Sequence, residues 1–266
     1  MLDLWSDLLE CLKLDVAGSQ TRFSAPNQHL EYHRIFGGQL LAQFVTTASL
    51  VTPDKTVKSL HALFPREGRA DEPVHYEVTR HHDGRSFSTL SITATQTKGP
   101  IGVAAVSMHA SEDGPSRQSV EPVGAVPGPD HDVALGLIPW ETRSTDDLNA
   151  ATTGPPEFEL WMRTPPVKPE LAAALAAYAT DLTLIGTALR PLDGLSQLGN
   201  GTQFTSAVTS HTIWFHRPFT TDQWLLLRQH SPLLANGRSF GRGDILTHDG
   251  TLVASYGQES LLRIPN

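Results

Sequence analysis

The stretch Asp83-Gly84-Arg85-Ser86-Phe87-Ser88 returns almost unchanged as Asn236-Gly237-Arg238-Ser239-Phe240-Gly241, an offset of 153 residues. Two further pairs of segments match in the same order at an offset of 150 residues: 61–64 with 211–215, and 103–108 with 253–258. Matches in the same order at nearly the same spacing indicate a duplicated structural unit. We therefore interpret the chain as two copies of one fold.

Each copy predicts one helix followed by four strands, separated by turn residues such as Asp83-Gly84. The first copy predicts a helix at 38–50 and strands at 56–64, 74–82, 86–97 and 101–109. The second predicts a helix from Pro169 to about Leu189 and strands at 205–216, 224–231, 238–247 and 252–263. The pattern indicates an α+β fold of two tandem domains, each a long helix packed on an antiparallel sheet. Sheets joined edge to edge would remove exposed edge strands.

Proline marks the boundary between the copies. We predict an N-terminal domain at 1–110, a proline-rich linker at 111–168 and a C-terminal domain at 169–266 that carries the active site. The linker should hold at most short helical pieces and should pack on the domains.

The composition excludes several classes of protein. A hydrophobic fraction of 39% in 266 residues supports a globular core, and a net charge of −8 argues against nucleic-acid binding. The single cysteine, Cys11, allows neither an intrachain disulfide nor a multi-cysteine zinc site. Residues 1–14 read as an amphipathic helix rather than a signal peptide, and no window reaches the apolar length that spans a bilayer. We expect a cytoplasmic protein without stable membrane insertion.

Several motifs together carry a family resemblance: 33–39 (His-Arg-Ile-Phe-Gly-Gly-Gln), 83–87, 211–219, 249–255 and Gln258-Glu259. In this order, and over nearly the whole chain outside the linker, they resemble the acyl-CoA thioesterase II family. The resemblance implies a double hotdog fold and hydrolysis of fatty acyl-CoA to free fatty acid and CoA. It implies no metal and no cofactor, since CoA is part of the substrate.

The resemblance also implies a catalytic Asp, a Thr or Ser, and a Gln, which act together on a water molecule from the second domain. The Asp corresponds to Asp181 and the Gln to Gln258, whereas the hydroxyl position holds Val208. Strand alternation places Ser206 and Ser210 on the face of Val208. We expect Ser210 to supply the hydroxyl, with Ser206 as the alternative.

The residues themselves give independent support for two of these positions. On a continuous helix, Asp181 shares a face with Ala177, Tyr178 and Leu184, where a carboxylate needs a function or local backbone partners. Gln258 stands where the first copy has Met108; its amide could bind a water, or simply face solvent.

Other signals are weaker. The pattern Gly237-x-Ser239-x-Gly241 fits a serine-hydrolase elbow, but a strand follows it instead of a helix, so we predict a structural turn. His211 and His216 are predicted to be packed, hydrogen-bonded core groups. The glycines after Phe36 allow close approach of a helix to a sheet or to pantetheine.

Two alternative functions remain open: an acyl-CoA-binding protein with weak or lost catalysis, and an enoyl-CoA hydratase-like enzyme. Assembly as a homo-oligomer is open as well.

Overall fold

The computed structural model describes residues 3–30 and 34–265, so His33 of the 33–39 motif lies outside the described residues. Contacts divide the chain into two compact units, each described by itself. Unit 1 comprises Met1–Arg117, Glu170–Ala179 and Thr212–Phe215, and unit 2 comprises Gln118–Pro169, Thr180–His211 and His216–Asn266.

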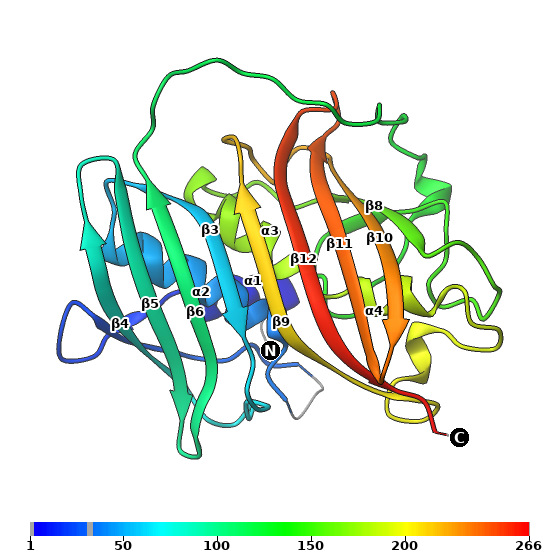
Figure 1. Ribbon diagram of the computed structural model, residues 1–266, viewed down its shortest axis with the longest axis horizontal. Helices are drawn as coiled ribbons and strands as arrows, with labels where there is room; N and C mark the ends of the chain where they lie inside the picture. Colours follow the sequence, from blue (N-terminus) through cyan, green and yellow to red (C-terminus); the bar gives the residue numbers. More distant parts are fainter. Residues whose placement is uncertain (1–2, 31–33, 266) are drawn as a thin grey trace. The chain divides into compact units, whose positions relative to one another are not determined.

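Unit 1 is an antiparallel sheet with the strand order β1-β2-β4-β5-β6-β3, and α2 lies against one of its faces (Figure 1). Its elements are α1 Leu4–Cys11, β1 Asp15–Val16, β2 Arg22–Ala25, α2 Gly37–Val51, β3 Thr56–Leu63, β4 Val74–Asp83, β5 Phe87–Gln96 and β6 Gly99–His109. The predicted helix and four strands are confirmed to within two residues. On β5 alternate residues are buried, because successive side chains point to opposite faces of the sheet and α2 covers one of them.

A buried polar group on α2 ties the N-terminal helix to this unit. The Gln43 side chain donates to the Cys11 carbonyl at 2.7 Å, and its Oε1 accepts from the Tyr76 hydroxyl at 2.6 Å. Gln43 and Tyr76 are both buried, so each bond replaces hydration that the groups lost on folding.

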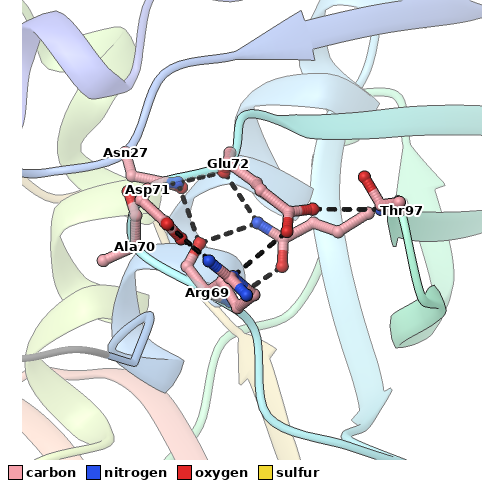
Figure 2. A network of polar contacts seen from close by, with 7 residues as sticks. Asn27, Arg69, Ala70, Asp71, Glu72 and Thr97 are labelled. Carbon is pink, nitrogen blue, oxygen red and sulfur yellow. Dashed lines mark hydrogen bonds and ion pairs between the residues drawn. The ribbon is translucent and has the colours of Figure 1, made fainter.

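The loop between β3 and β4 is fixed by side-chain amides, as Figure 2 shows. Asn27 donates to the backbone carbonyls of Ala70 and Glu72, and Gln96 donates to those of Arg69 and Glu72 at 2.8 and 2.7 Å. Asn27 also accepts from Gln39 near the start of α2, at 2.9 Å. The loop is therefore held against the N-terminal end of that helix.

Gly38 lies where the backbone leaves no room for a side chain. An added Cβ would overlap the Tyr178 carbonyl oxygen and would lie 2.5 Å from the Phe36 ring, which packs edge to face on Tyr178. Close packing inside unit 1 thus accounts for this glycine.

We predict that Gly38→Ala lowers the free energy of unfolding by about 1–3 kcal/mol, because the neighbouring backbone and ring must move. Urea unfolding followed by circular dichroism measures the change. Gly114→Ala is the matched control, since nothing lies within 4 Å of its added Cβ. Equal stability of the two variants would contradict the close approach at Gly38.

Unit 2 is an antiparallel sheet with the order β9-β12-β11-β10-β8-β7. Its strands are β7 Glu141–Arg143, β8 Glu157–Arg163, β9 Thr205–Phe215, β10 Leu225–Ala235, β11 Arg238–Thr247 and β12 Leu252–Arg263; the last four residues of β9 group with unit 1. The four strands predicted for the second copy are confirmed, but β10 continues to Ala235, four residues beyond the predicted end at 231. The ten-residue strand β11 has the predicted bounds, and Asn236 and Gly237 form the two-residue turn before it, with φ of 54° and 71°.

The proline-rich segment differs from its prediction. It contributes two strands, and β8 pairs with β10 from Leu225↔Met162 to His230↔Glu157. The prediction of only short helical pieces at 111–168 is therefore wrong for these strands; η1 at Pro129–His131 is such a piece. The expected packing is confirmed in unit 2: Val120, Val123 and Val126 cover a cluster of Trp161, Leu226 and Leu246.

The predicted helix at 169–189 is not continuous. After a short turn, η2 at Pro169–Leu171, helix α3 covers Ala172–Thr180 and α4 covers Leu184–Leu189. By length and composition the Pro169–Leu189 stretch could cross a membrane, contrary to our expectation that no window could. However, 78% of its apolar window is buried inside the protein, as in the core helix of a soluble protein.

Candidate active site

Asp181 lies directly after the end of α3, in the break before α4. Thr180, Asp181 and Thr183 have side chains that compete with helical backbone hydrogen bonds, which favours an interruption here. The prediction that Asp181 lies within a continuous helix is wrong, but the residue is buried, with 4% of its surface exposed. Because the helix stops, the Asp181 carbonyl oxygen faces a side chain from the sheet.

That side chain is Gln258 on β12. Alternate residues of this strand point into unit 2, so Tyr256, Gln258 and Ser260 are all buried. The Gln258 Nε2 lies 3.5 Å from the Asp181 carbonyl oxygen and donates to the Ser260 hydroxyl at 3.2 Å. The solvent-facing alternative for Gln258 is thereby excluded.

His211 on β9 completes the group. Its Nδ1 lies 2.8 Å from the Gln258 Oε1, and its Nε2 lies 3.0 Å from the Thr180 hydroxyl. The ring is fully buried and stacks on the Tyr256 ring at a centroid distance of 6.0 Å. Burial lowers the pKa of His211 to about 4, against a smaller opposite effect of the Gln258 hydrogen bond. His211 is therefore neutral at pH 7.

The partners fix the direction of each bond. If the Gln258 amide were turned over, its oxygen would face the Asp181 carbonyl oxygen, and two acceptors would meet without a proton. Nε2 therefore faces Asp181, and Oε1 accepts from a protonated Nδ1 of His211. Since the ring is neutral, its Nε2 carries no proton and accepts from the Thr180 hydroxyl.

The hydroxyl predicted for the site lies elsewhere. Ser210 is half-buried on β9 and, as the neighbour of His211, points to the opposite face of the strand. Thr209 donates to the Glu259 carbonyl oxygen at 3.0 Å. The structure thus brings Asp181 and Gln258 together but does not bring Ser210 to them; the hydroxyl beside Gln258 belongs to Ser260.

A role at this site was not predicted from the sequence for three of these residues: Thr180, Ser260 and His211. Ser260 could have been found, because it follows Gln258 by two residues and so shares its strand face. His211 was expected only as a packed core group, which its burial confirms. For His216 the expected packing in the core is wrong, because the residue is exposed, but the expected hydrogen bond is present, between its Nε2 and the Ser255 hydroxyl at 3.0 Å.

Ser239 has no nucleophilic geometry. It is buried within β11 and pairs with Ser260 of β12, so no helix follows the glycine pattern. The predicted structural role is confirmed. Among residues 3–30 and 34–265, no group of three or more His, Cys, Asp or Glu side chains could hold a metal ion.

The buried neutral His211 predicts acid-sensitive stability. Between about pH 6.5 and pH 4 the unfolded chain binds a proton at this ring that the folded protein does not bind. His211 therefore makes its full contribution to the free energy of unfolding above pH 6.5. This contribution is lost as the pH falls towards 4, and the free energy of unfolding decreases by about 3 kcal/mol over that range. Unfolding at several pH values, compared with His211→Asn, measures it. Parallel pH profiles of the two proteins would contradict the prediction.

Two units, each with a helix on an antiparallel sheet, define the chain as a double hotdog protein. A protein of Alicyclobacillus acidocaldarius described as having a hot dog fold matches with a TM-score of 0.77 at 18% identity, over 97% of this chain and 98% of that chain, which supports the fold alone. The acyl-CoA thioesterase II TesB2 of Mycobacterium marinum matches with a TM-score of 0.81 and 31% identity, over 97% of this chain and 99% of that chain.

The sequence comparisons identify the family. Residues 27–110 match the model of the acyl-CoA thioesterase N-terminal domain, and residues 111–262 match that of the C-terminal domain. Acyl-CoA thioesterase 2 of Haemophilus influenzae is 32% identical over 99% of both chains. The protein belongs to the acyl-CoA thioesterase family.

Proposed function

We propose that the protein hydrolyses fatty acyl-CoA thioesters to the free acid and CoA by direct attack of water. One observation carries the proposal. In a chain matched over its length by acyl-CoA thioesterases, Asp181 and Gln258 from distant parts of the sequence meet in a buried polar group of unit 2. The Gln258 carboxamide contacts the backbone carbonyl of Asp181, and the Asp181 carboxylate is itself buried. A carboxylate and a carboxamide in one buried group have the chemistry that activation of a water requires.

In this mechanism Asp181 accepts a proton from water as the water oxygen attacks the thioester carbonyl carbon. A negative charge develops on the carbonyl oxygen, and hydrogen-bond donors at the site stabilise it. The tetrahedral intermediate collapses as the carbon–sulfur bond breaks and the electron pair leaves on sulfur. The thiolate needs little acid assistance, because a thiol pKa of about 8.5 is close to neutral pH. The proton on Asp181 then returns to solvent or to the thiolate.

The residue roles are part of this proposal. Asp181 is the general base and Gln258 orients the water or the thioester carbonyl by hydrogen bonding. For the hydroxyl we favour Ser260, because it contacts Gln258 at 3.2 Å, over the sequence-based choice of Ser210. We further propose that the protein acts in the cytoplasm, in keeping with its single cysteine.

A thiol-release assay with short-, medium- and long-chain acyl-CoAs tests the function. We expect CoA release above the uncatalysed rate with at least one chain length. Ligand binding without thiol release for any acyl-CoA would replace hydrolysis by the binding alternative. Consumption of an enoyl-CoA double bond without thiol release would indicate hydration.

A further inference from the structure

We infer that His211 is a positioning residue, which fixes the Gln258 carboxamide with its N–H groups towards Asp181. Gln258 would then act as a hydrogen-bond donor to the reacting oxygen, whether of the water or of the thioester carbonyl. The inference rests on the proposed function, but the arrangement of the two side chains can be tested separately.

The hydrogen bonds run in one direction through the group. The Thr180 hydroxyl donates to His211, His211 donates to the Gln258 oxygen at 2.8 Å, and the Gln258 nitrogen faces Asp181. Thr180 is adjacent to Asp181 in the chain, so the end of α3 sets both the first donor and the proposed base. All four residues are at least 96% buried, and solvent therefore does not compete for these bonds.

The longest of these contacts, between Gln258 and the Asp181 carbonyl oxygen, is the one that a substrate could replace. At 3.5 Å, the Gln258 Nε2 is at the limit of hydrogen bonding to the Asp181 carbonyl oxygen, whereas the other bonds are of normal length. A reacting oxygen could replace this weak partner without breaking a strong bond. The His211 N–H meanwhile donates to the Gln258 oxygen, so the amide NH2 of Gln258 is the group left to form a hydrogen bond with the reacting oxygen.

Two substitutions at His211 separate positioning from packing. Asn places its amide N–H close to the position of the histidine Nδ1–H, whereas Leu fills the space without a donor. We expect His211→Leu to lower kcat by about 100-fold with KM nearly unchanged, and His211→Asn to retain kcat within about tenfold. A residue that only packs in an apolar core would tolerate Leu at least as well as Asn. Equal kcat values for the two variants would overturn the inference.

A double variant tests whether His211 acts through Gln258. Once Gln258→Leu has removed the amide, adding His211→Leu should lower kcat no further, since residues that act as one unit are not additive. A further large loss in the double variant would mean that His211 acts by another route.

The tautomer of His211 gives a test that needs no catalytic activity. In protein labelled with ¹⁵N-histidine, long-range proton–nitrogen spectra at pH 7 should show a neutral ring protonated at Nδ1, absent from His211→Asn. A ring protonated at Nε2 would overturn the arrangement. If the wild-type protein releases no thiol, the proposed function fails, while this spectrum still decides the orientation of Gln258.

Discussion

Asp181→Asn is expected to lower kcat of thioester hydrolysis by about 10²–10⁴-fold, the range that a general base contributes. The amide keeps the shape of the carboxylate but cannot accept a proton from water. KM should change little, because Asp181 acts on the attacking water rather than on CoA. Steady-state kinetics with the best acyl-CoA of the chain-length series measures the effect.

The matched control is Asp7→Asn in unit 1. Asp7 is also buried, with 5% of its surface exposed, and its carboxylate bonds to His29 at 2.6 Å. This variant should lose stability through the broken pair and keep the kcat of the wild-type protein. A loss of kcat in Asp7→Asn as large as that in Asp181→Asn would show that buried charge, and not base catalysis, explains the result.

The four strands that follow the helix in each copy could be predicted because their rules are local, whereas the short strands β1 and β2 were not predicted. The turn at Asn236-Gly237 sets the start of β11, and the alternation of side chains continues from it; neither signal depends on distant residues. The strands β7 and β8 could not be predicted, because they lie among prolines and form by pairing with partners far along the chain, as β8 does with β10. The proline-rich composition of 111–168 indicated a linker, but tertiary contacts bring part of this segment into the sheet of unit 2.

The break between α3 and α4 shows the same limit at the site. The alanine-rich run at 172–179 predicts a helix, and the local polar residues Thr180, Asp181 and Thr183 favour a stop before Leu189 without requiring one. The stop depends on tertiary partners of residues at the break: Thr180 bonds to His211, and the Asp181 carbonyl faces Gln258. Asp181 and Gln258 were named through the family resemblance. The role of His211 could not be predicted from the sequence, because it depends on which ring nitrogen meets which partner in the folded protein.

Gln258→Met is expected to lower kcat by about 10²–10³-fold, the cost of removing one donor from a site of developing negative charge. Methionine is the residue at the equivalent position of the first copy, Met108, where it is fully buried. It fills a similar volume, so the variant should fold. It also leaves the Nδ1–H of His211 without its acceptor, which should lower the free energy of unfolding by about 1–3 kcal/mol.

Gln229→Met separates the two effects. Gln229 on β10 is equally buried, and its amide bonds to Thr183, Thr187 and Tyr256 at 2.6–3.0 Å. Its loss should cost comparable stability and leave kcat within about tenfold of the wild-type value, because the amide lies outside the proposed catalytic set. If Gln229→Met and Gln258→Met reduced kcat equally, the chemistry would not depend on Gln258. If only Gln258→Met loses kcat, the difference between Met108 of the first copy and Gln258 of the second contributes to confining hydrolysis to the second copy.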